Sequence, residues 1–210
     1  MMKRKLTPET HQPFLYLLTL AYAFSTFASG ILMPIYAFFV QKIGGGILET
    51  AWAMALYSIL TGFGTILIHK TTWSHTYRKH LLWGGWLIWL ISMIIYLVMQ
   101  NVVALYISQI LNALGDAICG PVFDAEFSKK IEENLSGGWA MFEGTISISE
   151  GIASILGGSI ASYYGFEALL YCVITVAMIS FLLIAYYSYY ETTVDINFKT
   201  LKISSEPLKV

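Results

Sequence analysis

The chain has 210 residues, of which 57% are hydrophobic and 12% are charged, and its mean hydropathy is +0.65. A soluble domain carries about a quarter of its residues as charged side chains, so this composition excludes an ordinary water-soluble protein. The formal net charge of −1 argues against a nucleic-acid partner, which requires a basic surface.

The first expected element is the apolar run 14–40, which follows the basic start MMKRK. This run is longer than the core of a cleaved signal peptide and has no small-residue cleavage site, so we expect it to span a membrane. A spanning helix takes about 20 mostly apolar residues, and five later runs are also long enough. We therefore predict an all-α integral membrane protein with six transmembrane helices, over residues 14–40, 47–68, 81–99, 102–125, 139–163 and 166–190.

The basic residues predict how these spans are oriented. Of the twelve Lys and Arg, all but Lys42 fall on one side of a six-span arrangement. Lys and Arg concentrate in cytoplasmic segments, so we expect a multi-pass protein of the cell membrane with both termini in the cytoplasm. The predicted organisation is a cytoplasmic N-terminal segment, a transmembrane domain and a cytoplasmic tail, over residues 1–13, 14–190 and 191–210.

Polar residues recur every three or four positions on the fourth and fifth spans, which places them on one face of each helix. These two stripes consist of Gln109, Asn112, Asp116, Gly120 and Asp124, and of Glu143, Ser147, Glu150, Ser154 and Gly158. A charged side chain at membrane depth costs at least about 2.5–3.5 kcal/mol, so Asp116 and Glu150 are candidates for a functional role.

Simpler interpretations apply to other members of the stripes. Serines and glycines on membrane helices more often serve close packing. Asp124 and Glu143 lie near the cytoplasmic ends, where we expect them to be solvated or paired with Lys129 or Lys130. A milder stripe on the first span consists of Tyr22, Ser25, Thr26, Ser29 and Met33.

Other chemistry is not indicated by the sequence. The motifs G-x-S-x-G, H-E-x-x-H and G-x-x-x-x-G-K-[ST] do not occur, so we expect neither an enzyme nor a bound cofactor. His69, His75 and His80 crowd the loop after the second span, where a solvated basic loop is a better interpretation than a metal site. Cys119 and Cys172 lie in apolar runs and are expected to be core residues.

Four stretches carry residues at motif spacing. SGILMPIYAFFVQKIGG ends the first span in a glycine loop, and the basic loop HKTTWSHTYRKHLLWGG follows the second span. Gln109, Gly115 and Pro121 are spaced by six residues in the fourth span, and ASILGGSIASYYGF closes the fifth. Together, over residues 14–190, these stretches resemble one half of a major facilitator superfamily transporter.

The match has departures. Arg78 and Lys79 fit the family's loop G-x-x-x-D-R-x-x-R-[RK]-[RK], whereas Trp73 stands at its acidic position. Gln109 replaces the arginine that the family often uses in proton coupling. Gly157 and Gly158 fit the segment G-P-x-x-G-G, but Ala153 and Ser154 replace its Gly-Pro pair.

The resemblance implies a secondary transporter of small molecules that works by alternating access. Family members usually have twelve helices in two halves, which are related by an axis along the membrane normal. Two parallel copies of a half-size chain could rebuild that arrangement, so we expect a homodimer with a cavity between the protomers.

Site residues follow from this hypothesis. Asp116 and Glu150 are expected to couple transport to protons or cations, with the substrate held by Gln109, Asn112, Tyr22, Ser29, Tyr36 and Trp52. Helix packing and gating are assigned to Gly115, Pro121, Gly157, Gly158 and Arg78. Acidic groups and 15% aromatic residues favour lipophilic cations or amphiphiles as substrates, because an aromatic face attracts cations.

Three alternatives remain open at the level of sequence. The chain could be half of a heterodimeric transporter, a sugar transporter, or a membrane scaffold that does not transport. The missing Gly-Pro pair and the altered loop after the second span favour the scaffold to some degree.

Overall fold

A computed structural model describes residues 8–69, 77–131 and 135–204, with side chains for 14–68, 77–131 and 135–190. Within these ranges the chain forms helices joined by short turns, and no strand occurs. The helices are α1 (Pro8–Leu32), η1 (Met33–Ile35), α2 (Tyr36–Lys42), α3 (Ile47–His69), α5 (Arg78–Val98), α6 (Val102–Lys130) and α7 (Leu135–Ser204). The predicted all-α membrane fold is confirmed. The loop positions Trp73 and His75 lie outside the described residues.

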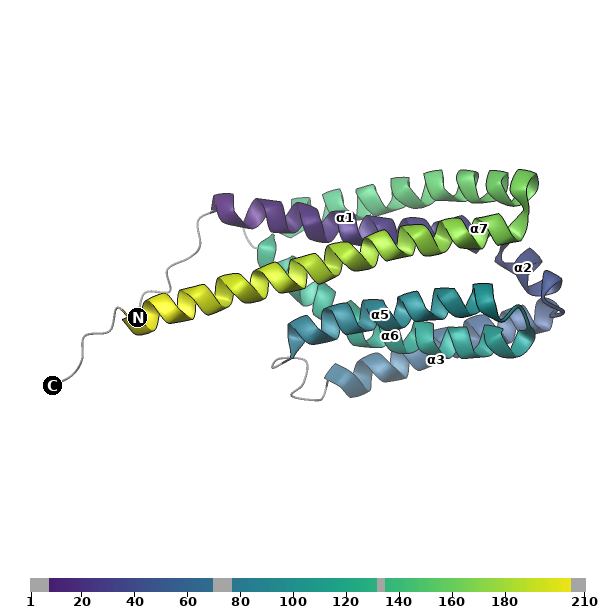
Figure 1. The fold of residues 1–210 in the computed structure, drawn as a ribbon, viewed down its shortest axis with the longest axis horizontal. Coiled ribbons are helices and arrows are strands. Elements are labelled where there is room, and N and C mark those ends of the chain that lie inside the picture. Colours follow the sequence, from purple (N-terminus) through teal and green to yellow (C-terminus); the bar gives the residue numbers. More distant parts are fainter. Residues whose placement is uncertain (1–7, 70–76, 132–134, 205–210) are drawn as a thin grey trace.

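Two breaks interrupt the helices, each for a local reason. Pro34 lies in η1, a 3-10 segment between α1 and α2, because proline has no N–H and its ring clashes with a preceding carbonyl. At Gly165 the backbone has φ 85° and ψ 173°, which interrupts α7 in a conformation that favours glycine. The chain reverses direction there (Figure 1), so α7 has a first arm, residues 135–164, and a second arm, residues 166–204.

Five helices are long and apolar enough to cross a membrane, over Phe14–Lys42, Ile47–Ile68, Arg78–Val98, Val102–Lys130 and Leu135–Tyr190. The last of these contains both arms of α7, which correspond to the fifth and sixth predicted spans. Most of the helices extend beyond the predicted spans, and the largest extensions are at the two termini. α1 begins at Pro8 and α7 continues to Ser204, so part of the predicted C-terminal tail is helical.

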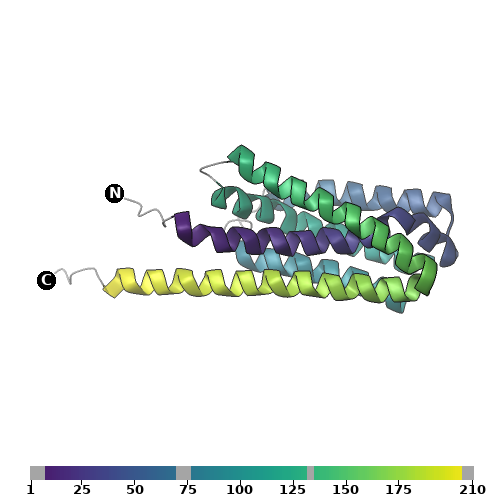
Figure 2. The same cartoon turned by 90° about the horizontal axis from the view of Figure 1, so that it is seen from above.

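The helices lie side by side along the long axis of the molecule in two groups (Figure 1). One group contains α1 and the two arms of α7, and the other contains α3, α5 and α6. α1 begins and α7 ends at the same end of the bundle, whereas the reversal at Gly165 and the α2–α3 turn lie at the opposite end (Figure 2). This arrangement matches the alternation of direction expected of six crossings.

A chain of two buried hydrogen bonds joins the two groups. Trp86 Nε1 of α5 donates to Ser180 Oγ of α7 at 2.9 Å, and Ser180 Oγ donates to the backbone oxygen of Ala21 in α1 at 2.7 Å. A hydrogen bond between membrane helices stabilises their association by about 0.6 kcal/mol on average. These two hydrogen bonds therefore contribute more to the orientation of α5 against α1 and α7 than to stability.

Glycines allow the closest helix crossings. A methyl group at Gly85 of α5 would lie 2.8 Å from the backbone oxygen of Gly115 in α6, so only glycine fits there without a shift. A methyl group at Gly157 would overlap the carbonyl oxygen of Ile31, where α7 crosses α1. The neighbouring Gly158 has no atom within 4 Å of such a methyl group.

Candidate functional site

The carboxylate of Asp116 lies in the middle of α6 and faces α3. Its Oδ2 accepts a short hydrogen bond from the Tyr57 hydroxyl of α3. Its Oδ1 accepts no hydrogen bond from any described residue. This oxygen is also not among the fully buried side-chain atoms of the described residues that lack a hydrogen-bond partner. One oxygen of this half-buried side chain is therefore fixed by the protein, and the other is open to water or to a ligand.

Acidic side chains from three positions act on one tyrosine hydroxyl. The hydroxyl of Tyr22 in α1 interacts electrostatically with Asp116, with Asp124 of α6 and with Glu143 of α7. Within the described part of the chain, no Lys or Arg forms an ion pair with these three carboxylates. The site therefore has an excess of negative charge when its carboxylates are ionised.

Three aromatic rings pack against the ring of Tyr22. Its ring centroid lies 4.7 Å from that of Phe123, 5.1 Å from that of Phe142 and 6.1 Å from that of Trp86. Phe123, Phe142 and Trp86 are buried, and together with Tyr22 they form an aromatic cluster contributed by four helices. The acidic residues thus lie beside a packed aromatic cluster.

Gln109 lies two turns before Asp116 on α6 and is buried in the bundle. Its Nε2 donates to the Tyr36 hydroxyl at 2.5 Å, which ties α6 to the first residue of α2. Between them, Asn112 Oδ1 is buried and accepts no hydrogen bond from the described residues. A buried acceptor without a donor costs about 1–3 kcal/mol, so Asn112 has the capacity to bind a donor from water or substrate.

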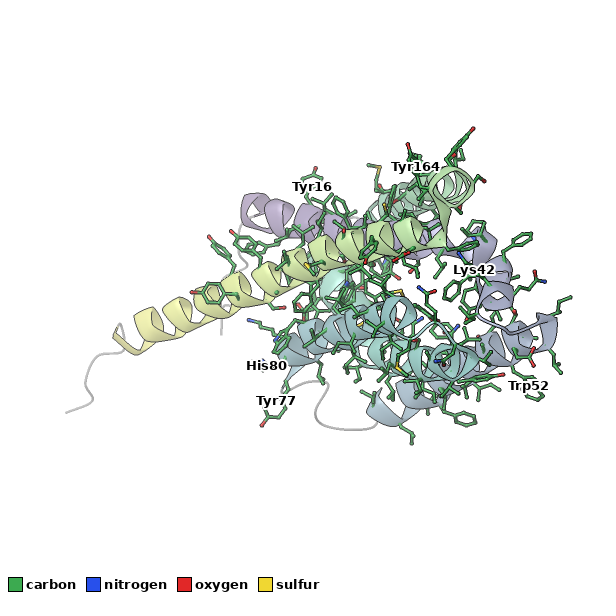
Figure 3. All side chains as sticks on the ribbon, turned by 45° about the vertical axis from the view of Figure 1, so that its right-hand side comes forward. Tyr16, Lys42, Trp52, Tyr77, His80 and Tyr164 are labelled. Atoms are coloured by element: carbon green, nitrogen blue, oxygen red, sulfur yellow. The ribbon has the colours of Figure 1, made fainter. Side chains whose placement is uncertain are left out.

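Three predicted site residues lie on the surface of the protomer. Trp52 is 62% exposed and points away from the bundle near the start of α3 (Figure 3). Ser29 of α1 and Glu150 of the first arm of α7 are also exposed. Among the described residues, no hydrogen bond or ion pair links these side chains to Asp116. Their assignment to one site with Asp116 remains a prediction.

The predicted packing residues occupy different environments. Gly115 and Gly157 lie at the two close helix crossings, whereas Gly158 faces open space. Pro121 lies inside α6 without ending it, because the helix continues to Lys130.

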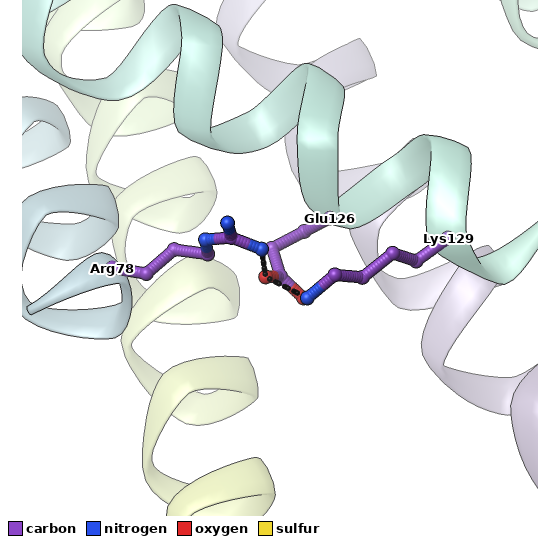
Figure 4. Close-up of polar contacts among 3 residues, drawn as sticks. All are labelled: Arg78, Glu126 and Lys129. Atoms are coloured by element: carbon purple, nitrogen blue, oxygen red, sulfur yellow. Dashed lines mark hydrogen bonds and ion pairs between the residues drawn. The ribbon is translucent and has the colours of Figure 1, made fainter. Parts of the chain in front are cut away.

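An ion-pair group of three residues lies at the end of the bundle where α5 begins and α6 ends (Figure 4). Arg78 Nη1 lies 2.8 Å from Glu126 Oε1, and Lys129 Nζ lies 3.1 Å from the same oxygen. The Glu126 side chain is only 9% exposed, so it is shielded more than either cation. Lys129 therefore pairs with Glu126 rather than with Asp124, which is exposed.

The sequence-based predictions assigned no role to Tyr57, to Glu126 or to the aromatic residues Trp86, Phe123 and Phe142. Glu126 precedes Lys129 by three positions, a spacing typical of helical ion pairs, and this signal was available. Tyr57 lies in a largely apolar run, and nothing in the sequence pairs it with Asp116.

No group of three or more His, Cys, Asp or Glu able to hold a metal ion occurs in the described ranges. The family model of the Major Facilitator Superfamily matches residues 18–204. No curated protein and no solved structure matches the chain.

Proposed function

The chain belongs to the Major Facilitator Superfamily, a family of secondary transporters, and on this premise we propose that it exchanges lipophilic cations for protons by alternating access. The observation that carries the proposal is the Asp116 carboxylate, which is half-buried at the middle of a membrane-spanning helix and has one oxygen open. Intramembrane carboxylates are rare, and they mark ion pathways and proton relays in pumps and transporters.

Charge and shape support a cationic substrate. Three carboxylates lie around the Tyr22 hydroxyl, and among the described residues none of them is neutralised by Lys or Arg. The rings of Tyr22, Phe123 and Phe142 pack together beside these carboxylates, and an aromatic face attracts a lipophilic cation. Proton and cation then compete for Asp116, and this competition is what couples their movements in opposite directions.

The surface of the first arm of α7 supports assembly as a parallel homodimer in the cell membrane. Glu143, Ser147 and Glu150 are exposed along this arm, and methyl groups at Gly144 and Gly151 would meet no atom within 4 Å. Exposed carboxylates in hydrocarbon are costly, so this face needs a protein partner or a water-filled cavity. In the proposal the partner is a second copy, related by an axis along the membrane normal, with the termini of both copies in the cytoplasm.

Transport into liposomes tests the proposal directly. The purified protein is reconstituted, and ethidium serves as a lipophilic cation probe with the liposome interior made acidic. We expect ethidium to accumulate only while the pH gradient lasts. The opposite gradient, applied to the same liposomes, tests movement of proton and cation in the same direction.

The Asp116→Asn variant preserves the size of the side chain and removes its charge. We expect it to lose accumulation driven by the pH gradient while it still exchanges preloaded ethidium downhill. Thr175→Ala, an exposed position on the second arm of α7, is the matched control and should behave like the parent. If Asp116→Asn accumulates ethidium as well as the parent does, Asp116 is not the coupling residue. If the parent moves no cation under either gradient, a non-transporting scaffold becomes the better interpretation.

A further inference from the structure

Tyr57 of α3 contacts the candidate coupling residue on α6 directly. We propose that Tyr57 is a positioning residue for Asp116: it holds Oδ2 and leaves Oδ1 as the oxygen that binds the proton or the cation. The inference rests on the proposed function, because it assigns Tyr57 a part in the coupling at Asp116.

Close packing of α3 against α6 fixes the distance that the Tyr57 side chain has to bridge. A methyl group at Gly64 of α3 would lie 2.8 Å from the Cβ of Ala117, the residue that follows Asp116 on α6. The two helices therefore pack closely there, and a side chain larger than glycine at residue 64 would need a shift. Since Gly64 lies two turns after Tyr57, the same face of α3 supplies both the contact and the hydroxyl.

The hydrogen bond also distinguishes the two protonation states of Asp116. A tyrosine hydroxyl donates to an ionised carboxylate with a charge-assisted bond, which is about twice as strong as a bond between neutral groups. When Asp116 takes up a proton, the bond to Tyr57 weakens but remains possible, because a carboxylic acid still accepts hydrogen bonds. Tyr57 thus favours the ionised form of Asp116.

The other titratable groups around Asp116 are few. Tyr22 of α1 and Cys119 of α6 interact with it electrostatically, while Asp124 of α6 and Glu143 of α7 act on Tyr22. From α5, the residues packed closely against this part of α6 are Gly85 and Trp89, which do not titrate. Within the described ranges, Tyr57 is the one side chain that donates a hydrogen bond to Asp116, so its removal should affect that carboxylate selectively.

The test is an infrared titration of the protein in lipid bilayers without substrate. A protonated carboxyl group gives a C=O stretching band, and the band of Asp116 is identified as the one that Asp116→Asn removes. In Tyr57→Phe we expect the band to shift in frequency. We also expect it to reach half its intensity at a pH about one unit higher than in the parent, because a hydrogen bond to the charged form is lost.

Ser180→Ala is the matched control, since it also removes a buried hydrogen bond between helices but lies away from the carboxylates. Its titration should coincide with that of the parent. An unchanged Asp116 band in Tyr57→Phe would overturn the proposal, as would a Tyr57→Phe protein that does not fold, because the hydroxyl would then be a structural tie. Because this readout needs no transport, it can succeed or fail independently of the ethidium assay.

Discussion

Gly157 and Ile31 are in contact backbone to backbone, and a methyl group at residue 157 would overlap the Ile31 carbonyl oxygen. This contact sets how closely the first arm of α7 approaches α1. Membrane helices associate through such close packing rather than through the hydrophobic effect, so the contact should be sensitive to a single added carbon.

We expect Gly157→Ala to destabilise the protein by about 1–3 kcal/mol, the usual cost of overpacking a fitted contact. The adjacent Gly158→Ala is the matched control because it adds the same methyl group to open space. It should leave stability unchanged or raise it by up to about 1 kcal/mol, because alanine favours a helix over glycine. Thermal unfolding in detergent measures both, and equal losses in the two variants would contradict the contact.

Glu126→Gln tests the ion-pair group at the ends of α5 and α6. The variant keeps the shape of the side chain but leaves the Arg78 guanidinium, which is 20% exposed, without its carboxylate. We expect a loss of about 1.5–3 kcal/mol in unfolding free energy, typical of a hydrogen bond to a charged group. Lys129→Met should cost less than about 1 kcal/mol, because the Lys129 side chain is 57% exposed and its pair is screened by solvent.

The Gln109–Tyr36 hydrogen bond should be measurable with a double-mutant cycle. We compare Gln109→Leu, Tyr36→Phe and the double variant by thermal unfolding. The expected coupling energy is about 0.6 kcal/mol and at most about 1.7 kcal/mol, as for other hydrogen bonds between membrane helices. Strictly additive losses would show that the two side chains do not interact, despite the 2.5 Å separation of Gln109 Nε2 and Tyr36 Oη.

Cysteine labelling tests the orientation in the membrane. Gln100 lies in the α5–α6 turn and Ser136 at the start of α7, and both are exposed at opposite ends of the bundle. Because the basic residues predict cytoplasmic termini, we expect a cysteine at Gln100 to react with an impermeant thiol reagent outside intact cells. A cysteine at Ser136 should react only after the cells are opened. The reverse pattern would invert the proposed topology.

Cross-linking tests the proposed homodimer. A cysteine at Ser147, on the exposed face of the first arm of α7, should form a disulfide between protomers in native membranes. A cysteine at Thr175, on the second arm, is the control and should not form one. Cross-linking of Thr175 without Ser147 would place the interface on the other arm. A partner of different mass at Ser147 would indicate a heterodimer.

Those parts of the structure that depend on one helix at a time could be predicted from the sequence. The apolar runs gave the spans, and the break between the predicted spans 139–163 and 166–190 coincides with the reversal at Gly165. The stripe of Gln109, Asn112 and Asp116 followed from helical periodicity alone.

Features that depend on how two helices rotate against each other could not be predicted. Gly157 and Gly158 are indistinguishable in sequence, yet only Gly157 meets a neighbouring backbone. The sequence does not distinguish Tyr57 from the other aromatic residues of α3, because its partner Asp116 lies on a helix that is distant in the chain. The same limit applies to Glu126, whose pairing with Arg78 requires that the ends of α5 and α6 meet.

The order of Tyr57 and Asp116 along the chain has a consequence for biogenesis. α3 is synthesised before α6, so the hydroxyl donor is already in the bilayer when the carboxylate arrives. When α6 leaves the translocon, Asp116 can then form its hydrogen bond with Tyr57 at once. The carboxylate is thereby spared an exposure to lipid without a partner, which would cost at least about 2.5–3.5 kcal/mol. We therefore expect membrane insertion of α6 to become less efficient in Tyr57→Phe, which removes this hydrogen bond.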